Sequence, residues 1–350
     1  MFDQPKAVRK GEQLDEQKLS KYLRSIFPWV TGPLKLLQFP SGFSNLTYAL
    51  NVGERNYVLR RPPFGANIKS GHDMGREFRI LSGLYPVFSK VPEPIHFCQD
   101  PEIIGAPFYI MERVDGIIVR KSPPKQLSTA SFFAKLSNSA ASSLAEIHAV
   151  DVVKAGLNDL GKPEGYVQRQ IEGWTRRYAR AKTDEIALMD EIANWLAQNM
   201  PTEAGASLIH NDYKYDNFIL DPRSYAINVI LDWEMATIGC PLMDLGATLG
   251  YWLQPDDDRR LHLLPLCPTY LPGNLSRRGF AECYAAQTGR SLKHLLFYYV
   301  YGVWRIAVII QQIYARFKAG VTQDQRFSIL GVGVQLLAQQ GAKAIDRGKV

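Results

Sequence analysis

The chain has 350 residues, of which 46% are hydrophobic and 21% are charged. This composition is typical of a globular protein, and the length allows two domains or one large two-lobed unit. The four cysteines form no C-x-x-C pair and have no histidine at metal-ligand spacing, which favours reduced thiols over a disulfide framework. The N-terminal segment has no apolar core of the signal-peptide kind, so we expect a cytoplasmic protein.

The net charge of +7 is concentrated at one end of the chain, because residues 255–350 contain 13 Lys and Arg but 6 Asp and Glu. A basic segment can serve nucleic acid, a membrane surface or an anionic small substrate, or it can be a solvated face. Nucleic-acid binding has only this charge in its favour. The most apolar stretch, Leu295–Tyr314, includes Arg305 and is predicted to be a buried core helix. We therefore expect neither nucleic acid nor a membrane as partner.

The predicted elements begin with an amphipathic helix over Asp15–Phe27, where apolar residues recur at helical spacing. A helix over 71–84 and a strand over Pro107–Val114 come later, and from Ser128 the pattern is helical. His148, on an apolar helix face, is expected to be a hydrogen-bonded core residue. Alternating patterns between the first two helices predict strands at Leu36–Phe39, Ser44–Val52 and Arg55–Arg61.

Three further short strands are predicted between residues 207 and 231, each rich in β-branched and aliphatic residues. They span Ser207–Ile209, Asn217–Leu220 and Ala226–Leu231. The Asp-Pro-Arg-Ser sequence between the last two is typical of a tight turn. The last two strands are therefore expected to form a hairpin.

Polar residues lie at the ends of these strands. The hairpin would bring Asn217 and Asp232 roughly opposite one another, with Asp212 in the loop before its first strand. This set suits Mg²⁺, which takes one or two protein carboxylates and keeps several waters. Asn217 and Asp232 are the predicted metal ligands, and Asp212 would remain free to accept a proton from an attacking hydroxyl. The alternative interpretation is that these polar residues are ordinary solvated loop residues. That interpretation suits any one of them taken alone better than it suits all of them at this spacing.

The H-x-D-x-x-x-x-N sequence that begins at His210, followed by L-D-W-E, resembles the aminoglycoside phosphotransferase and choline kinase-like superfamily. That superfamily is similar in fold to the protein kinases. The resemblance implies Asp212 as catalytic base, Asn217 and Asp232 on the metal, and ATP as phosphoryl donor. His210 is expected to brace this loop, and Asp244 to brace it and to cap the following helix.

The resemblance also implies a nucleotide-binding role for the loop between the first two long strands, because a Gly/Ser loop can offer backbone N–H groups to phosphate. Its candidate residues are Ser41, Gly42, Ser44 and Asn45. By position in the hinge between the two lobes, the carbonyl of Glu112 and the amide of Val114 are the expected adenine contacts.

Arg60 lies at the end of the third strand, next to its last residue, where many members of the superfamily have a lysine that contacts the α- and β-phosphates. A guanidinium can do the same because it binds phosphate bidentately, and Arg61 is the alternative residue for this role. Glu77 on the following helix would pair with the arginine, as in the strand–helix ion pair of kinases. A surface charge cluster of Glu77 with Arg76 and Arg79 is the other interpretation.

Motifs along nearly the whole chain resemble the kinase domains fused to some acyl-CoA dehydrogenases. They include S-G-F-S-N-L-T-Y, Y-V-L-R-R-P-P-F-G, H-D-M-G-R-E-F-R-I-L, P-F-Y-I-M-E-R and the helical Y-G-V-W-R-I-A-V-I-I-Q-Q. This resemblance implies a hydroxyacyl-CoA as acceptor, and the basic C-terminal segment would suit the CoA phosphates. Tyr301 and Arg305 are assigned to the acceptor pocket, and Cys240 stands where related sequences often have an acid.

We therefore predict an α+β, protein-kinase-like fold with an antiparallel sheet and a helix in the first lobe and a mainly helical second lobe. Residues 1–113 would form the N-terminal nucleotide-binding lobe and residues 114–350 the catalytic and acceptor-binding lobe, with the hinge near residues 111–116. The predicted activity is ATP- and Mg²⁺-dependent phosphoryl transfer to a small-molecule hydroxyl. Aminoglycoside phosphorylation ranks second, because polycations fit the basic segment poorly. A nucleotide-binding pseudokinase without catalysis is the third possibility.

Overall fold

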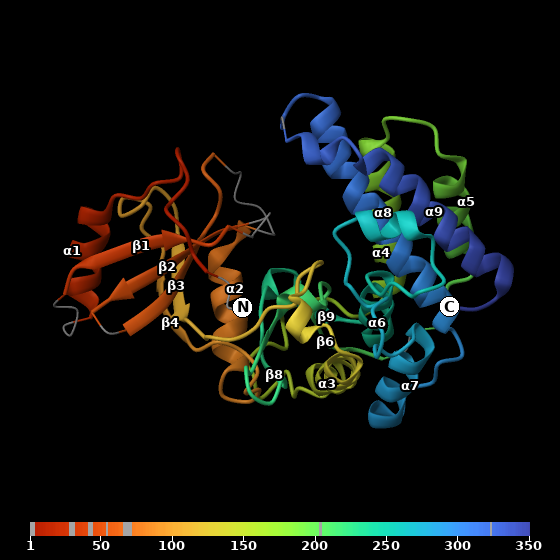
Figure 1. The fold of residues 1–350 in the computed structure, drawn as a ribbon, viewed down its shortest axis with the longest axis horizontal. Helices are drawn as coiled ribbons and strands as arrows, with labels where there is room; N and C mark the ends of the chain where they lie inside the picture. The colour runs from red at the N-terminus through yellow and green to blue at the C-terminus, as the bar shows by residue number, and fades with distance from the viewer. Residues whose placement is uncertain are drawn as a thin grey trace. The chain divides into compact units, whose positions relative to one another are not determined.

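The computed structural model describes residues 4–27, 32–40, 45–53, 55–65, 72–202, 205–322 and 324–350. The chain divides into two compact units. Unit 1 consists of Met1–Ile118, Val153–Leu157 and Phe218–Ala236, and unit 2 consists of Val119–Val152, Asn158–Asn217 and Thr237–Val350. The predicted α+β class is confirmed, since an antiparallel sheet dominates unit 1 and helices dominate unit 2 (Figure 1).

Unit 1 is built on a five-stranded antiparallel sheet with the strand order β1-β2-β3-β5-β4. The strands are β1 (Leu34–Gln38), β2 (Leu46–Val52), β3 (Arg55–Arg61), β4 (Pro94–Cys98) and β5 (Phe108–Glu112). Strand β3 has its predicted bounds. Strand β4 was missed, because a five-residue run that starts with proline and contains histidine shows no clear alternation.

Helices α1 (Glu16–Ile26) and α2 (Met74–Leu84) of unit 1 cover opposite faces of this sheet (Figure 1). On one face, Leu19 and Leu23 of α1 join Tyr48 and Leu50 of β2 in a buried apolar cluster. On the other face, the ring of Phe78 in α2 stacks on Phe97 of β4. The sheet therefore has two buried faces.

Helix α2 starts later than the sequence pattern predicts, at Met74. The carboxylate of Asp73 accepts a hydrogen bond from the backbone N–H of Arg76, which is the geometry of a helix N-cap. Residues 73 and 74 therefore fix where the helix begins, and the acid Glu77 falls in its first turn with its side chain buried.

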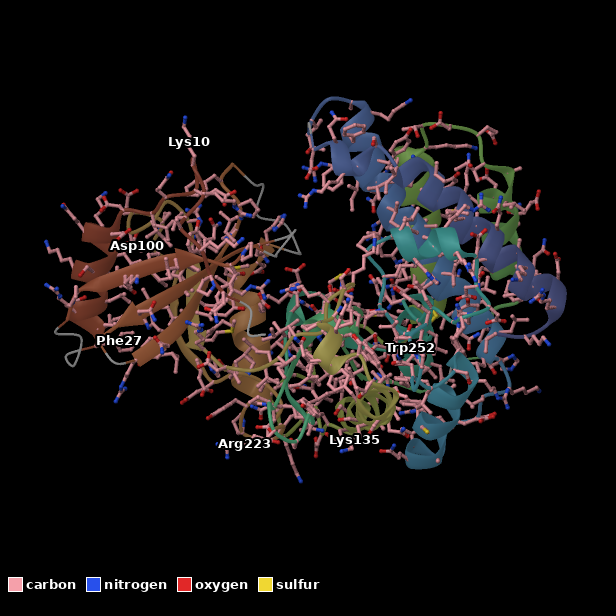
Figure 2. The ribbon with its side chains drawn as sticks, viewed as in Figure 1. Lys10, Phe27, Asp100, Lys135, Arg223 and Trp252 are labelled. Atoms are coloured by element: carbon pink, nitrogen blue, oxygen red, sulfur yellow. The ribbon has the colours of Figure 1, made fainter. Side chains whose placement is uncertain are left out.

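A hairpin of β7 (Phe218–Leu220) and β8 (Ile227–Ile230) completes unit 1, with Phe218 paired to Ile230. The predicted hairpin is thus confirmed, and Arg223 marks its turn in Figure 2. Its first strand is one residue shorter than expected, because Asn217 ends a 3₁₀ turn, η3 (Tyr215–Asn217). A second 3₁₀ turn, η4 (Trp233–Met235), follows β8.

Unit 2 contains seven helices in the part of the chain that the structure describes. These are α3 (Ala130–His148), α4 (Tyr166–Ala181), α5 (Ala187–Gln198), α6 (Pro241–Gly250), α7 (Arg277–Thr288), α8 (Leu295–Lys318) and α9 (Leu330–Arg347). A small sheet pairs β6 (Ser207–Ile209) with β9 (Thr237–Gly239). Strand β6 was predicted, whereas the three residues of β9 are too few to show a pattern of their own.

Helix α8 is the central helix of unit 2 and packs against α6 and α9. Its backbone comes so close to α6 that a Cβ atom added to Gly302 would lie 1.9 Å from the carbonyl oxygen of Gly246. Glycine at both positions therefore allows the two helices to touch along their backbones. By length and composition α8 could cross a membrane, but 78% of its most apolar window is buried inside the protein, as predicted for a core helix.

Candidate active site

The loop His210–Asn217, here called the Asp212 loop, follows β6 in unit 2 and is fixed by a buried carboxylate. Both carboxylate oxygens of Asp244 accept backbone hydrogen bonds of 2.7 Å, one from the N–H of His210 and one from that of Asn211. The imidazole Nε2 of His148 lies 3.1 Å from the same carboxylate. Asp244 therefore braces the loop, and His148 is the buried, hydrogen-bonded core residue that the sequence predicts.

The expectation that Asp244 caps α6 is wrong. The helix begins at Pro241 after Cys240, so Asp244 lies in its first turn, and its carboxylate is used by the Asp212 loop instead. Burial alone would raise the pKa of Asp244, but the hydrogen bond and charge of His148 and the charge of His210 outweigh it, so its pKa lies below its usual value. A buried, ionised carboxylate is a strong acceptor for backbone N–H groups.

The backbone of the loop is left-handed at Asn211, with φ of 68°. Few residues other than glycine adopt this conformation, and asparagine is one of those that do so most often. The Asn211 carbonyl accepts a 2.8 Å hydrogen bond from Nη1 of Arg305 in α8, and its side-chain oxygen accepts one from the hydroxyl of Tyr166. Helices α4 and α8 thus hold the residue that directly precedes Asp212.

Three side chains of unit 2 contact the carboxylate of Asp212. Oδ1 accepts a 3.0 Å hydrogen bond from the hydroxyl of Tyr251, and Oδ2 accepts a 3.1 Å bond from Nδ2 of Asn217. The ammonium group of Lys214 lies 3.0 Å from Oδ2. Burial would raise the pKa of Asp212, but the charge and hydrogen bond of Lys214 prevail and its pKa is lowered. Asp212 is therefore an ionised carboxylate at neutral pH.

Asn217 has a defined amide orientation because its Nδ2 also donates to the backbone carbonyl of Asp212, at 2.8 Å. With the nitrogen directed at Asp212, the amide oxygen points elsewhere and is suited to act as an oxygen ligand. The side chain is buried, at 8% exposure, and lies at the end of the loop.

An aromatic and cationic wall, defined here as Tyr166, Trp174, Arg177, Tyr301 and Arg305, lies on α4 and α8 beside the loop. The guanidinium of Arg305 lies 5.1 Å from the ring centroid of Trp174, and that of Arg177 lies 4.6 Å from it. Both distances fit cation–π contacts. Burial is the largest cause that raises the pKa of Tyr301, to about 12, and nearby Arg305 opposes this rise.

Unit 1 contains a second group of charged residues, the Arg60 cluster of Arg60, Glu77, Asp232 and Glu234. Arg60 Nη1 lies 2.7 Å from a Glu77 carboxylate oxygen, and Nη2 lies 3.0 Å from Asp232 Oδ1. The carboxylate of Glu234 lies 3.7 Å from the same Nη2. The predicted ion pair of Arg60 with Glu77 is thus present. Burial would lower the pKa of Arg60, but Glu77 and the other acids keep it well above its usual value.

Arg61 has a different environment from Arg60. Its guanidinium donates to the backbone carbonyls of Pro62 and Ile104 and lies over the ring of Phe64. Since α2 presents its buried acid to Arg60, the geometry favours Arg60 as the functional arginine of the pair.

Asp232 occupies a strained position at the end of the hairpin. Its backbone is left-handed, with φ of 68°, and η4 begins directly after it. Non-glycine residues in this region cost roughly 1–3 kcal/mol, and such strain is concentrated at functional sites. The carboxylate of Asp232 is 29% exposed and so is accessible from solvent, unlike the buried Glu77.

Asn45, the described end of the predicted phosphate loop, is tied to this cluster. Its Nδ2 donates a 2.6 Å hydrogen bond to Glu234, and its Oδ1 lies 2.9 Å from Nδ1 of His72. Ser41, Gly42 and Ser44 lie outside the described residues. The two predicted adenine contacts lie at the end of the sheet, with Glu112 as the last residue of β5 and Val114 two residues beyond it.

Comparison with known proteins identifies the family. Residues 35–265, about two thirds of the chain, match the phosphotransferase enzyme family. The chain belongs to this family. The resemblance drawn from the H-x-D-x-x-x-x-N and L-D-W-E motifs is therefore confirmed.

One relative of this phosphotransferase is acyl-CoA dehydrogenase family member 10 of the mouse, which is 32% identical over 348 residues. The match covers 97% of this chain and 31% of that protein, so the chain spans about a third of the relative's length. The predicted similarity to the kinase domains of acyl-CoA dehydrogenase family proteins is confirmed.

Solved structures agree with the family assignment. A Ralstonia eutropha JMP134 protein provisionally assigned as an aminoglycoside phosphotransferase is 29% identical, with a TM-score of 0.79 over 96% of this chain and 99% of that one. A thermostable mutant of the aminoglycoside phosphotransferase APH(4)-Ia, in ternary complex with AMP-PNP and hygromycin B, is 16% identical, with a TM-score of 0.60 over 93% of this chain and 98% of that one. The kinase-like fold of the phosphotransferase is thereby confirmed.

Each unit of the phosphotransferase contains oxygen donors of the kind that Mg²⁺ prefers. In unit 2, Asn217 offers an amide oxygen. In unit 1, Asp232 and Glu234 offer carboxylates, and all three are hard oxygen ligands. Among the described residues, no group of three or more His, Cys, Asp or Glu is placed to hold a metal ion.

Two residues at Asp212 were missed from the sequence. Lys214 lies two positions after Asp212 within the H-x-D-x-x-x-x-N motif, so this short spacing could have indicated it as a charge partner. Tyr251 follows α6 and is 39 residues from Asp212, and no local pattern connects the two. Only the packing of α6 in the folded unit brings its hydroxyl to the carboxylate.

Proposed function

We propose that the protein is an ATP- and Mg²⁺-dependent phosphotransferase that transfers the γ-phosphoryl group to a hydroxyl of a small molecule. The observation that carries this proposal is the ionised carboxylate of Asp212, held in a braced loop by Lys214, Asn217 and Tyr251. An ionised acid in a fixed orientation can align a hydroxyl and accept its proton as the bond to phosphorus forms.

Arg60 has the proposed role of contact to the α- and β-phosphates. Its guanidinium is held by Glu77 and is charged throughout the working pH range. Guanidinium groups bind phosphate oxygens in pairs, which suits a residue at the end of a rigid strand. The backbone of residues 41–45, the Glu112 carbonyl and the Val114 amide complete the proposed nucleotide contacts.

Asn217 and Asp232 are the proposed ligands of Mg²⁺, which when bound would neutralise charge on the transferring phosphoryl group. The pairing of Phe218 with Ile230 supports this assignment, because it places the residue before β7 and those after β8 at one end of the hairpin. The acidic excess of the Arg60 cluster, three carboxylates near one guanidinium, supports attraction of a cation.

A hydroxyacyl-CoA is the proposed acceptor. The two arginines in cation–π contact with Trp174 favour an anionic or carbonyl-bearing acceptor over a polycation. The relative named as an acyl-CoA dehydrogenase family member points to acyl-CoA chemistry in the proteins that contain this domain. Phosphorylation of an aminoglycoside is the second candidate, since the solved complex with hygromycin B has the same fold. A nucleotide-binding protein without catalysis is the third candidate. It would leave the fixed orientation of the Asp212 carboxylate without a catalytic use.

The test is ADP release from ATP and Mg²⁺ with a panel of hydroxyacyl-CoAs, choline-like alcohols and aminoglycosides. We expect acceptor-dependent turnover with one or more hydroxyacyl-CoAs. Asp212→Asn should lose a factor of about 10²–10⁴ in turnover, the usual contribution of a positioned base. Asp256→Asn is the matched control, because Asp256 is an exposed aspartate of the same unit. Full activity of Asp212→Asn would contradict the proposed role.

A further inference from the structure

Tyr251 contacts both members of the Asp212–Lys214 ion pair. Its hydroxyl donates to Oδ1 of Asp212 at 3.0 Å, and its ring faces the Lys214 ammonium, which lies 5.0 Å from the ring centroid. The residue is 8% exposed and its backbone N–H closes the C-terminal end of α6. A rigid helix end therefore determines where the hydroxyl points.

The two carboxylate oxygens of Asp212 are not equivalent. Oδ2 is contacted by two donors, Asn217 Nδ2 and Lys214 Nζ. Oδ1 accepts a hydrogen bond from Tyr251 alone among the described residues. Since each carboxylate oxygen has two lone pairs, Oδ2 is saturated and Oδ1 retains one acceptor position. A substrate hydroxyl that approaches Asp212 would therefore donate to Oδ1.

We propose that Tyr251 is a positioning residue that directs Oδ1 of Asp212 at the acceptor hydroxyl. The inference rests on the proposed phosphotransferase function. It adds that Oδ1 is the oxygen of Asp212 that accepts the proton and that Tyr251 fixes its orientation. The tyrosine hydroxyl fixes the rotation of the carboxylate about its Cβ–Cγ bond from one side, while Lys214 and Asn217 fix it from the other.

The chemical step balances as follows. The acceptor oxygen forms a bond to the γ-phosphorus, and the bond between that phosphorus and the β,γ-bridging oxygen breaks with its electron pair leaving on ADP. The proton of the acceptor hydroxyl passes to Oδ1 of Asp212. Tyr251 keeps its own proton throughout, because it acts as a hydrogen-bond donor to the carboxylate.

The variant Tyr251→Phe removes the hydroxyl and keeps the ring that faces Lys214. We expect kcat for acceptor phosphorylation to fall about tenfold, the size expected for the loss of one hydrogen bond to a charged group. KM for ATP should remain within about twofold of the wild type, because Tyr251 has no proposed nucleotide contact. The ratio of ADP released to acceptor phosphorylated should rise. A carboxylate that is free to rotate aligns the acceptor hydroxyl less well, so water competes more often for the phosphoryl group.

Tyr299→Phe is the matched control. Its hydroxyl is also buried in unit 2, but it accepts a hydrogen bond from Gln340 and lies in the buried network of Asp257 and Arg277. It should lower the melting temperature by an amount similar to Tyr251→Phe without changing the coupling ratio. If Tyr251→Phe folds poorly, a crystal structure of the wild type with acceptor bound decides, because the proposal requires the acceptor hydroxyl on Oδ1.

The two failures are distinguishable. If Asp212→Asn is inactive while Tyr251→Phe has wild-type kcat and coupling ratio, the role of Tyr251 is overturned and the phosphotransferase function stands. An acceptor hydroxyl found on Oδ2 would overturn it in the same way. If Asp212→Asn is fully active, the proposed function fails, and the inference that rests on it fails as well.

Discussion

The Asp212 loop and the Arg60 cluster combine charges in opposite ways. In the loop, the carboxylate of Asp212 is contacted by an ammonium, an amide and a phenol, so it is held by several donors. In the cluster, one guanidinium faces the carboxylates of Glu77, Asp232 and Glu234, so formal negative charge is left over. The first arrangement suits a group that must keep one orientation, and the second suits a group that must attract a cation.

Both regions depend on a buried carboxylate for support, but the partners differ. Asp244 supports the loop through two backbone N–H groups, so it fixes the path of the chain at residues 210 and 211. Glu77 supports the cluster through the guanidinium of Arg60, so it fixes a side chain. Removing the Asp244 carboxylate should therefore disturb catalysis. Removing the Glu77 carboxylate should disturb the charge balance of the Arg60 cluster and its proposed contact to the nucleotide.

The largest effect is expected from Arg60→Met. Removing one partner of a buried ion pair typically costs about 3–5 kcal/mol of unfolding free energy, because Glu77 is left unpaired. Removing the only guanidinium of the cluster also increases its negative charge, so Mg²⁺ alone should raise the melting temperature of the variant more than that of the wild type. Chemical and thermal unfolding, with and without Mg²⁺, measure both changes.

Arg61→Met is the control for that prediction. Its guanidinium donates to the carbonyls of Pro62 and Ile104, so the variant should lose stability without gaining a response to Mg²⁺. An Arg60→Met protein whose melting temperature responds to Mg²⁺ as the wild type does would show that the carboxylates do not attract the cation.

A smaller loss is expected from Asp244→Asn. The amide can accept from one backbone N–H but presents an NH₂ group to the other, and hydrogen bonds to a charged acceptor are worth about 1.5–3 kcal/mol each. Because the backbone at Asn211 would relax, kcat should fall at temperatures where the variant is folded. Steady-state kinetics at a low temperature, paired with a melting curve, separate the two effects.

Asp257→Asn provides the comparison for Asp244→Asn. Asp257 is also a buried carboxylate of unit 2, and it pairs with Arg277 and accepts the backbone N–H of Gln254. Its loss should lower stability without lowering kcat. Equal losses of kcat in both variants would mean that Asp244 has no specific effect on the Asp212 loop.

The smallest effect is a dependence of stability on pH that comes from His148. Burial lowers the pKa of His148, partly offset by Asp244, so the unfolded chain binds a proton more readily than the folded one. Its contribution to stability is complete above the unfolded pKa of about 6.5 and is lost as pH falls below that value, by at most about 1.4 kcal/mol per pH unit. Unfolding curves between pH 5 and pH 8 measure the slope.

His148→Gln should flatten that slope. His96→Gln is the matched comparison, since burial lowers the pKa of His96 as well, but its ring is only partly buried. If the wild type and His148→Gln show the same slope below pH 6.5, His148 does not carry this part of the pH dependence.

Much of this geometry follows from local sequence, and the rest does not. Asp212, Asn217 and the hairpin could be predicted because their spacing lies within one short stretch and the turn residues are characteristic. The bounds of strand β3 could be predicted to the residue because a turn sequence precedes it and two prolines follow it. The support of the loop by Asp244 was expected from position, but its supposed capping role was wrong because helix α6 begins earlier.

Contacts that only tertiary packing creates could not be predicted. Strand β9 is three residues long and is stabilised by its pairing with β6, so no propensity marks it. The hydroxyl of Tyr251 reaches Asp212 through the packing of α6, whose backbone comes close to α8 at Gly246 and Gly302. The choice between Arg60 and Arg61 likewise depends on which side chain faces α2, and adjacent residues of a strand point to opposite faces.

The most direct test of the proposed metal and nucleotide site is thermal unfolding of the wild type and of Asp232→Ala, with ATP, in the presence and absence of Mg²⁺. A ligand at 100 times its dissociation constant stabilises a protein by about 2.7 kcal/mol, which a melting curve resolves. We predict a clear rise in melting temperature for the wild type with Mg²⁺ and ATP together, and a much smaller rise for Asp232→Ala. Equal rises in both proteins, or no rise in the wild type at saturating nucleotide, would contradict the assignment of Asp232 to a Mg²⁺–ATP site.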